Sequence, residues 1–336
     1  MKTATRRRIA GLAAAAAMAT AAAFGTQACK QTGAKARPVE ERAAAPDFNA
    51  DSAYHYCARQ CSFGPRTMNS EAHDSCGRWI AATFQRLGCK VTEQKATLRG
   101  YDGTELRATN IIASYAPGAK RRILLLAHWD TRPWADNDPD KANHGKPIDG
   151  ADDGASGVAV MMEVARLLSE SEAPAVGVDF LCTDAEDWGA PQWEENHQQG
   201  DDWALGAQHF AANIPEGFAP EYGILLDMVG GKGAKFHREA VSMHYAGGIV
   251  AKVWQAARDA GYGQYFPQAD GAAVTDDHLP LNRAGIPTID IIPFHPDCPQ
   301  GSFGPVWHTL QDNMANIDKA TLKAVGQTVV QTIYSE

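Results

Sequence analysis

The chain has 336 residues, of which 44% are hydrophobic and 21% are charged, and its formal net charge at pH 7 is −9. This is ordinary globular composition, and the length suits one large α/β domain with additional terminal segments. The acidic balance argues against nucleic acid as a main partner, because binding phosphates requires basic patches.

The first 28 residues have the pattern of a secretory signal peptide. Lys2 and the arginines at 6–8 are basic, and an alanine-rich apolar run follows at 9–24. This run is shorter than the about 20 residues that a membrane-spanning helix needs. We therefore expect an exported protein that is periplasmic, associated with the outer membrane as a lipoprotein, or secreted. Cys29 is the candidate site for a lipid anchor, and the arginines leave the general and the twin-arginine export routes open.

Residues 29–48 are rich in Lys, Arg, Glu, Ala and Pro and show no periodicity, which predicts a flexible linker. The remaining residues, 49–336, are predicted to form a single α/β domain. The spacing of the seven cysteines does not define a disulfide pairing. Cys57 and Cys61 are spaced as on one face of a helix, and Cys182 lies in an apolar run and is expected to be a core residue.

The pattern of apolar residues predicts two helices, two strands and then an alternation of strands and helices. The opening helices are expected at 51–60 and 70–87, and the opening strands at 90–98 and 107–114. Further strands are expected at 122–127, 176–182, 223–226 and 288–292, with helices at 156–168, 205–212, 248–260 and 319–334. Continuous apolar strands are typical of parallel sheets that are buried on both faces. We therefore predict a three-layer α/β/α sandwich with a mostly parallel, mixed sheet, in which only the earliest strands are antiparallel, at one edge.

Acids and histidines follow directly after these predicted strands. Ligands and catalytic groups gather outside the carboxyl ends of the strands in open α/β sheets, so side chains that are distant in sequence can meet there. Three carboxylates and two imidazoles in one crevice would form a good zinc site. The residues concerned are His128, Asp153, Asp187, Asp227 and His308.

Each of these residues also has a plainer explanation when it is taken alone. A histidine after a strand is usually only hydrogen-bonded, and Asp130 is placed to orient His128. The pair Asp152 and Asp153 precedes a helix and could cap it, although two acids exceed what a cap needs, and we expect Asp153 to point into the crevice. An isolated Asp227 among apolar residues is costly to bury unless it is paired or binds a metal.

The segment Asp184-Ala185-Glu186-Asp187 is the strongest local signal. Its three acids would repel one another and raise their pKa values without benefit unless a metal offset the repulsion. One acid could then bind the metal while its neighbour acts as a general acid or base. A second acidic cluster, Asp276-Asp277-His278, could be a polar loop or a helix cap.

These motifs together resemble the zinc aminopeptidase and glutaminyl cyclase superfamily, and within it the bacterial glutaminyl-peptide cyclotransferases, over about residues 50–335. The matching segments are Ala127-His128-Trp129-Asp130, the run 150–158, Asp184-Ala185-Glu186-Asp187, Leu226-Asp227 and Trp307-His308-Thr309. The resemblance implies a zinc-exopeptidase-like fold. It also implies that Asp153, Asp187 and His308 bind zinc and that Glu186 is the general acid/base. Asp187 departs from the glutamate that is more usual at its position.

Two reactions are compatible with this resemblance. A cyclase would hold one zinc ion and convert the N-terminal glutamine of a peptide or protein to pyroglutamate with release of ammonia, the zinc polarising the γ-amide carbonyl. An aminopeptidase would bind a second zinc at His128 and Asp227. The run Asp276-Asp277-His278 favours the cyclase, because the resemblance implies two acids before this histidine in cyclases and a small residue in aminopeptidases. The catalytic residues of the cyclase would be Glu186, Asp227 and Asp276. A non-catalytic binding domain is disfavoured, because such a relative would be expected to lose a metal ligand or the base.

Aromatic and apolar residues are expected to form the substrate pocket. The candidates are Trp307, Ile292, Phe303 and Trp193, with Trp188 as an alternative to Trp193 and core packing as the alternative role for both tryptophans. The loop at 294–305 contains three prolines and two glycines and is long enough to shape the entrance.

Overall fold

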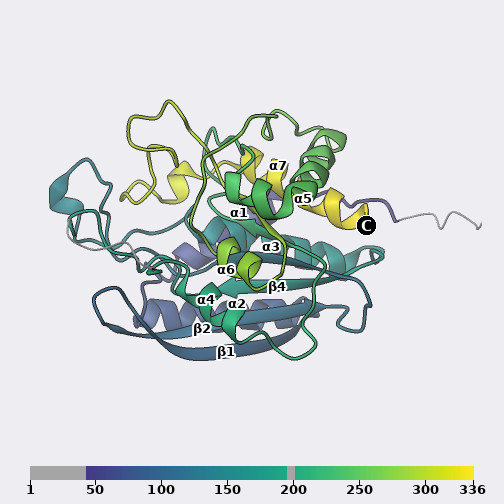
Figure 1. Cartoon of the computed structure of the whole chain (residues 1–336), viewed down its shortest axis with the longest axis horizontal. Helices are drawn as coiled ribbons and strands as arrows, with labels where there is room; N and C mark the ends of the chain where they lie inside the picture. Colours follow the sequence, from purple (N-terminus) through teal and green to yellow (C-terminus); the bar gives the residue numbers. More distant parts are fainter. Residues whose placement is uncertain (1–42, 195–200) are drawn as a thin grey trace, which may run out of the picture. The chain divides into compact units, whose positions relative to one another are not determined.

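The computed structural model describes residues 43–194 and 201–336. The proposed signal peptide, Cys29 and most of the proposed linker lie outside the described residues. A six-stranded sheet with the order β1-β2-β4-β3-β5-β6 runs through the described part (Figure 1). Its strands are β1 (Lys90–Arg99), β2 (Glu105–Tyr115), β3 (Arg122–His128), β4 (Gly177–Thr183), β5 (Gly223–Leu226) and β6 (Thr288–Ile291).

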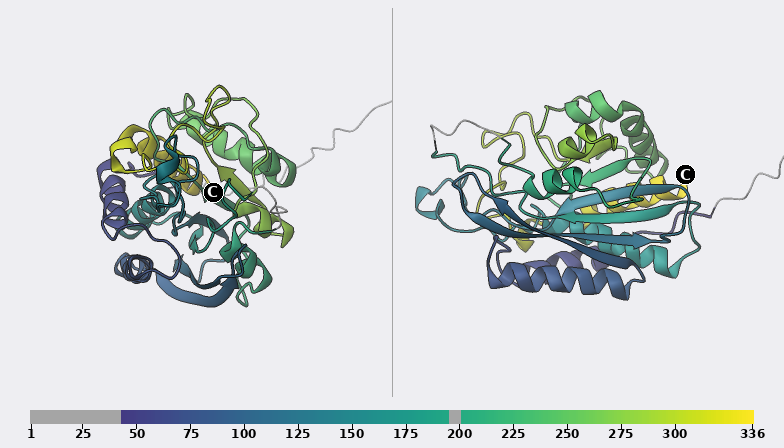
Figure 2. Two further views of the ribbon diagram at one scale, coloured as in Figure 1. Left: turned by 90° about the vertical axis from the view of Figure 1, so that its left-hand side faces the viewer. Right: turned by 60° about the horizontal axis from the view of Figure 1, so that its bottom comes forward.

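The sheet is parallel from β4 through β3 and β5 to β6, and antiparallel where β2 pairs with β1 and β4. Every residue of β4 is buried, as expected for a strand that is covered on both faces. The long antiparallel pair β1 and β2 forms one edge (Figure 2). The prediction of a mostly parallel, mixed sheet with its antiparallel strands at one edge is therefore confirmed.

Helices cover both faces of the sheet. Ile123 and Leu125 of β3 belong to the larger core, together with residues of α1, α3 and α7, whereas Leu124 and Leu126 pack on the opposite face with residues of α4 and α6. The short helices α4 and α6 lie in front of the strands in Figure 1. The predicted three-layer sandwich is thus confirmed. The helices are α1 (Ala50–Cys61), α2 (Glu71–Arg86), α3 (Ala155–Glu170), α4 (Leu205–Ala212), α5 (Ala240–Asp259), α6 (His278–Arg283) and α7 (Lys319–Tyr334).

Two helices differ from the sequence prediction. Helix α5 begins at Ala240 rather than at 248, because the Glu239 side chain accepts hydrogen bonds from the main-chain N–H groups of Val241 and Ser242 and so caps the helix. Its backbone bends at Ala246, just before the two glycines that marked the expected start. The six-residue helix α6 was not predicted; it begins at His278, and Asp277 of the acidic cluster occupies its N-cap position without a side-chain capping bond.

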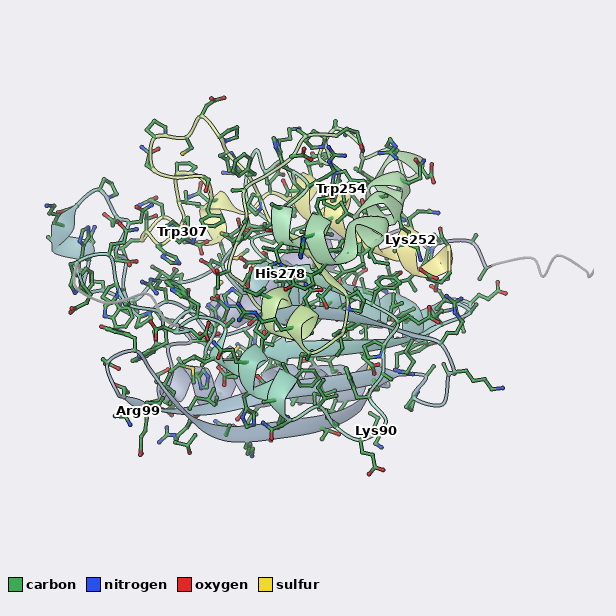
Figure 3. All side chains as sticks on the ribbon, in the orientation of Figure 1. Lys90, Arg99, Lys252, Trp254, His278 and Trp307 are labelled. Atoms are coloured by element: carbon green, nitrogen blue, oxygen red, sulfur yellow. The ribbon has the colours of Figure 1, made fainter. Side chains whose placement is uncertain are left out.

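No helix in 43–194 or 201–336 is long and apolar enough to cross a membrane. The cysteines in these ranges are free thiols, and Cys182 is fully buried within β4, as predicted. The loops that follow the parallel strands lie at one end of the sheet. Figure 3 shows Trp307 on the same side of the structure as Arg99, where β1 ends, and opposite Lys90, where β1 begins.

Candidate active site and metal centre

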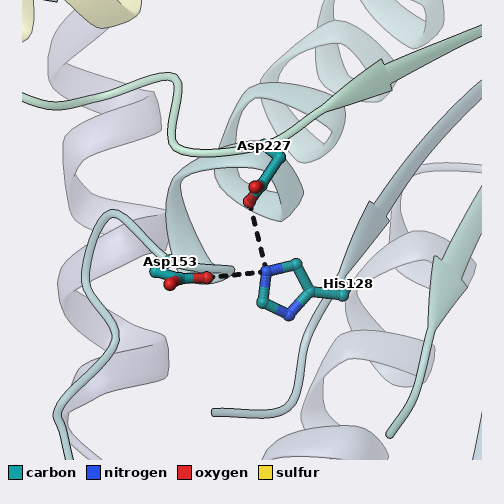
Figure 4. A group of neighbouring side chains, drawn as sticks. All are labelled: His128, Asp153 and Asp227. Atoms are coloured by element: carbon teal, nitrogen blue, oxygen red, sulfur yellow. Dashed lines mark hydrogen bonds and ion pairs between the residues drawn. The ribbon is translucent and has the colours of Figure 1, made fainter. Parts of the chain in front are cut away.

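The first group of metal-ligating side chains lies at the carboxyl ends of β3 and β5. His128 is the last residue of β3, Asp227 follows β5, and Asp153 lies in the loop before α3 (Figure 4). The His128 Nε2 atom is 3.0 Å from Asp153 Oδ1 and 3.2 Å from Asp227 Oδ1. All three side chains are buried.

A second group shares Asp153 with the first. The His308 Nε2 atom is 3.5 Å from Asp153 Oδ2 and 3.3 Å from Asp187 Oδ1. In each group the potential ligand atoms all lie within 4.8 Å of one another. Asp153 therefore presents one carboxylate oxygen to each imidazole, which is the arrangement that a bridging ligand between two adjacent metal positions would have.

The second group fits a zinc ion in its donor chemistry. Two carboxylates and one imidazole form a ligand set of the kind found in catalytic zinc sites, which keep a fourth position open for water or substrate. The Asp187 Oδ2 atom is buried and has no hydrogen-bond partner. A buried carboxylate oxygen without a partner is costly, and a bound cation would satisfy it.

Left-handed backbone conformations occur beside the ligands. Ala185, Met228 and His308 have φ values of 52°, 51° and 55°. Residues other than glycine seldom adopt this conformation, and it is concentrated at functional sites, where the surrounding structure holds it in place. Here it turns the chain sharply after β4 and β5 and in the loop that carries His308.

Two further aspartates hold the ligand loops through main-chain hydrogen bonds. Asp130 accepts bonds of 3.1 Å from the N–H of Glu186 and 3.2 Å from the N–H of Asp187, and its carboxylate is 3.5 Å from His128 Nδ1. Asp312 accepts bonds of 2.7 Å and 3.1 Å from the N–H groups of Asp152 and Asp153. The carboxylates of Asp130 and Asp312 thus connect the loops that carry the candidate ligands.

The ligands open into a cavity of about 480 Å³. Its acidic and imidazole lining consists of Asp153, Glu186, Asp187, Asp227, Asp276 and His308. Its apolar lining includes Trp203, Met228, Val274, Ile292, Phe303 and Trp307. The structure therefore brings the predicted ligands, the predicted catalytic acids and three of the four predicted pocket residues to one place.

The fourth predicted pocket residue, Trp193, does not line this cavity. It is 44% exposed and packs against Trp134 and His144 instead, whereas Trp203 occupies the cavity wall. The alternative, Trp188, also lies outside the lining and packs against Trp134. The Trp203 ring is nearly parallel to that of His308, at 6.1 Å between the ring centres.

The acids in the cavity have unusual protonation behaviour. Burial raises the pKa of Glu186 well above its ordinary value; the His128 charge opposes this shift, and the charges of Asp187 and Asp276 add to it. The pKa of Asp276 is also well above its ordinary value, first because of burial and then because of the nearby Asp227 charge. Perturbed carboxyls in a cavity are typical of groups that exchange protons with a substrate.

The remaining acids of the predicted clusters serve the fold. Asp184 is 2.8 Å from His73 Nε2, and Asp152 accepts a hydrogen bond of 2.7 Å from the N–H of Gly230. Asp277 accepts a hydrogen bond from the Thr183 hydroxyl. These carboxylates join segments at the carboxyl end of the sheet to α2, to the loop after β5 and to the end of β4, respectively.

Sequence reasoning missed three residues of the site and its surroundings. Trp203 lies in a short segment without periodicity before α4, so no pattern distinguished it from the other tryptophans. Arg132 and Asp136 form a buried ion pair with a 2.6 Å contact next to Asp187 and His308. Their spacing of four residues was the available signal, but a charged pair in a loop is usually exposed.

Residues 110–333 match the family model described as Peptidase family M28. The chain belongs to peptidase family M28. The family match begins within β2 and ends in α7, so it contains all five residues of the two metal-ligating groups.

Solved structures of similar proteins bear two different names. The chain is 51% identical to a glutaminyl cyclase from Bacteroides thetaiotaomicron, crystallised with N-acetylhistamine, over 87% of this chain and 100% of that one, with a TM-score of 0.85. It is also 51% identical to a leucine aminopeptidase precursor from the same organism, over 88% and 99% of the two chains, with a TM-score of 0.84.

Curated relatives are more distant. The chain is 27% identical over 239 residues to the glutaminyl-peptide cyclotransferase of Gloydius blomhoffii, a match that covers 64% of this chain and 61% of the relative. The match thus spans about three fifths of the length of that curated relative.

Proposed function

We propose that this M28 protein is a zinc-dependent glutaminyl-peptide cyclotransferase, which converts the N-terminal glutamine of peptides or proteins to pyroglutamate and releases ammonia. The observation that carries the proposal is the placement of Asp276 and Glu186 in the wall of one aromatic-lined cavity, beside the second metal-ligating group. The similarity to solved glutaminyl cyclases supports it.

Zinc held by Asp153, Asp187 and His308 would polarise the γ-amide carbonyl of the substrate glutamine and stabilise the charge that develops on its oxygen. Glu186 would take a proton from the attacking α-amine and return it to the departing ammonia. A carboxyl whose pKa is raised by burial and by nearby negative charges is suited to both steps, because it holds a proton more readily than an exposed glutamate does.

The other side chains would hold the substrate in its reactive form. The reaction is intramolecular, so much of the rate enhancement comes from bringing the α-amine close to the γ-carbonyl. The apolar walls formed by Trp203, Trp307 and Phe303 would exclude water, and the carboxylates of Asp227 and Asp276 would accept hydrogen bonds from the substrate amine and amide.

A dinuclear zinc aminopeptidase is the second candidate, and one observation favours it. Asp153 offers an oxygen to both imidazoles, so both groups of ligands are complete. In this reading His128 and Asp227 would hold a second zinc, and the reaction would release the N-terminal residue by hydrolysis.

The decisive experiment compares two substrates and counts zinc. Purified protein is expected to convert a peptide with N-terminal glutamine to its pyroglutamyl form, seen by mass spectrometry as the loss of one ammonia, with about one zinc per chain. Leucine-p-nitroanilide is the matched substrate for the alternative. Release of p-nitroaniline together with two zinc ions per chain, and no pyroglutamyl product, would rule out the cyclase.

We also propose that the protein acts outside the cytoplasm, on the basis of the signal-like pattern in residues 1–28. Mass spectrometry of the mature N-terminus tests this. A chain that begins near residue 29 is expected, with a lipid mass added if Cys29 is the anchor; a chain that retains residues 1–28 would contradict export by this signal.

A further inference from the structure

A buried arginine lies directly behind the second metal-ligating group. Arg132 is 1% exposed, and its guanidinium donates to both oxygens of Asp136, with Nε–Oδ1 at 2.9 Å and Nη2–Oδ2 at 2.6 Å. The Nη1 atom donates to the Asp187 carbonyl at 3.1 Å and lies 3.5 Å from Asp187 Oδ1. The guanidinium therefore forms a two-point contact with one aspartate while it contacts a second aspartate that is a zinc ligand.

The partner of this arginine contacts the other end of the zinc site. The Asp136 Oδ1 atom is 3.3 Å from His308 Nδ1. The next residue, Asn137, donates its main-chain N–H to the His308 carbonyl at 3.0 Å. The ring lies with Nε2 facing Asp153 and Asp187, and its buried Nδ1 makes no hydrogen bond, so the Asp136 carboxylate is the group placed to accept one from it. A carboxylate at Nδ1 fixes the tautomer in which Nε2 carries the lone pair that a metal needs.

Neither member of the pair faces the substrate. Arg132 and Asp136 are both buried, and neither lines the cavity. The buried guanidinium lies over the Trp203 ring, 4.7 Å from its centre. The remaining donors of Arg132 bond to the main-chain carbonyls of Gly189 and Ala190. A direct role in binding or reacting with substrate is therefore excluded by position.

We propose that Arg132 and Asp136 act as one positioning unit, which fixes the ligands Asp187 and His308 in the geometry that zinc requires. This inference rests on the zinc site of the proposed function, but not on the reaction catalysed there. Zinc affinity depends on the pair, and substrate affinity does not. Asp187 and His308 lie 121 residues apart in sequence. Besides their direct 3.3 Å contact, the pair links them from behind, through Arg132 to Asp187 and through Asp136 to His308.

The test measures zinc dissociation by competition with a chelator of known affinity. Asp136→Asn keeps the shape of the side chain but removes its charge, and zinc binding is expected to weaken by roughly 10- to 100-fold, as for other partners of metal-binding histidines. Arg132→Lys keeps the charge but loses the two-point contact, and it is expected to weaken zinc binding to a similar extent. With zinc in excess, both variants should recover the parent KM for a glutaminyl peptide.

A second Arg–Asp pair, in which the aspartate is buried and the arginine is partly buried, provides a matched control. Arg122 contacts both oxygens of Asp179, at 2.8 Å and 2.7 Å, near the amino end of β3 and β4, far from the metal ligands along both strands. Asp179→Asn therefore makes the same chemical change without touching the site. It is expected to lower the thermal unfolding midpoint while leaving the zinc dissociation constant unchanged.

The outcomes separate this inference from general destabilisation and from the proposed reaction. If Arg132 and Asp136 act as a unit, the double variant binds zinc no more weakly than the weaker single variant. Parent-like zinc affinity in Asp136→Asn, additive losses in the double variant, or an equal loss in Asp179→Asn would each overturn the proposal. If Asp136→Asn does not fold, Arg132→Lys carries the test. Because zinc affinity is measured without substrate, a failure of cyclase activity is recorded separately.

Discussion

Asp130 accepts a hydrogen bond of 3.1 Å from the main-chain N–H of Glu186, although 56 residues separate the two. The bond fixes the direction in which the chain leaves β4, and it therefore fixes where the Glu186 carboxyl points. The same aspartate is 3.5 Å from His128, the residue that its sequence position suggested it would orient. Its stronger contacts are to the loop that carries Glu186, the proposed general acid/base, and Asp187, a candidate zinc ligand.

The first prediction concerns Glu186 as the proton carrier. Glu186→Gln is expected to lower kcat by roughly 10²- to 10⁴-fold, the usual contribution of a general acid/base. Zinc content should remain that of the parent, because Glu186 belongs to neither metal-ligating group. Asp187→Asn is the matched variant and should lose zinc. Parent-like turnover in Glu186→Gln, measured as pyroglutamyl product per time, would remove Glu186 from its role.

Asp276 is the residue expected to distinguish cyclase activity from aminopeptidase activity. Its Oδ2 atom is buried without a hydrogen-bond partner in the cavity that also contains Glu186. Asp276→Ala is expected to reduce kcat/KM for glutaminyl peptides by at least about tenfold, since a hydrogen bond to a charged group is typically worth 1.5–3 kcal/mol. The assay is initial-rate cyclisation at saturating zinc. A near-normal rate would show that this residue does not distinguish the two reactions.

Trp203 and Trp193 are expected to differ in their effect on substrate binding. Trp203 lines the cavity, whereas Trp193 is 44% exposed beyond it. Trp203→Ala removes a large apolar contact and should raise KM by roughly tenfold or more. Trp193→Ala is the control and should leave KM within about twofold, as for surface substitutions in general. Steady-state kinetics with one glutaminyl peptide measures both, and the reverse order would restore the assignment of Trp193 to the pocket.

Gly157 permits the close approach of α3 to the sheet. A Cβ atom at this position would lie 2.0 Å from the Leu226 carbonyl oxygen and 2.8 Å from the Ala127 Cβ. Gly157→Ala is expected to reduce the free energy of unfolding by about 1–3 kcal/mol, because the strands next to the candidate metal ligands would have to move. Urea denaturation measures the change.

Gly248 in α5 is the control for this substitution. No atom would lie within 4 Å of a Cβ there, so Gly248→Ala should raise the free energy of unfolding by up to about 1 kcal/mol through helix propensity. Equal effects of the two substitutions would show that the contact at Gly157 is relieved without cost.

Cys61 is predicted to be the most acidic of the thiols in the helices α1 and α2. The neighbouring Cys57 thiol and the Arg66 guanidinium lower its pKa to about 7 against the opposing effect of burial, whereas burial raises the pKa of Cys76 to about 12. Because the thiolate is the reactive form, alkylation of Cys61 by iodoacetamide should reach half its maximal rate near pH 7. Peptide mass spectrometry follows the label, and Cys61→Ser is the control. A rate that rises only above pH 8.5 would contradict the lowered pKa.

Much of the fold could be predicted from the sequence, because its signals are local. The periodic and continuous apolar runs predicted the boundaries of most elements within one or two residues. Helices α5 and α6 are the exceptions: α6 was not predicted, and α5 begins earlier than predicted. The start of α5 depends on the Glu239 side chain, which also accepts a hydrogen bond from the distant N–H of Val274, and no local pattern reports that contact.

The sequence by itself determined which residues could hold a metal and act on a substrate, because acids and histidines after buried strands must gather at one end of a parallel sheet. Only the tertiary structure decided which of these residues contact one another and which face the cavity. In the structure Asp153 faces both imidazoles, and Asp184 is hydrogen-bonded to His73. Trp203 rather than Trp193 lies in the cavity wall. Arg132 is also buried behind two ligands. The reason is physical: the order of residues fixes which strand or loop carries a side chain, whereas the direction of that side chain is set by packing and hydrogen bonds between loops that are far apart in sequence.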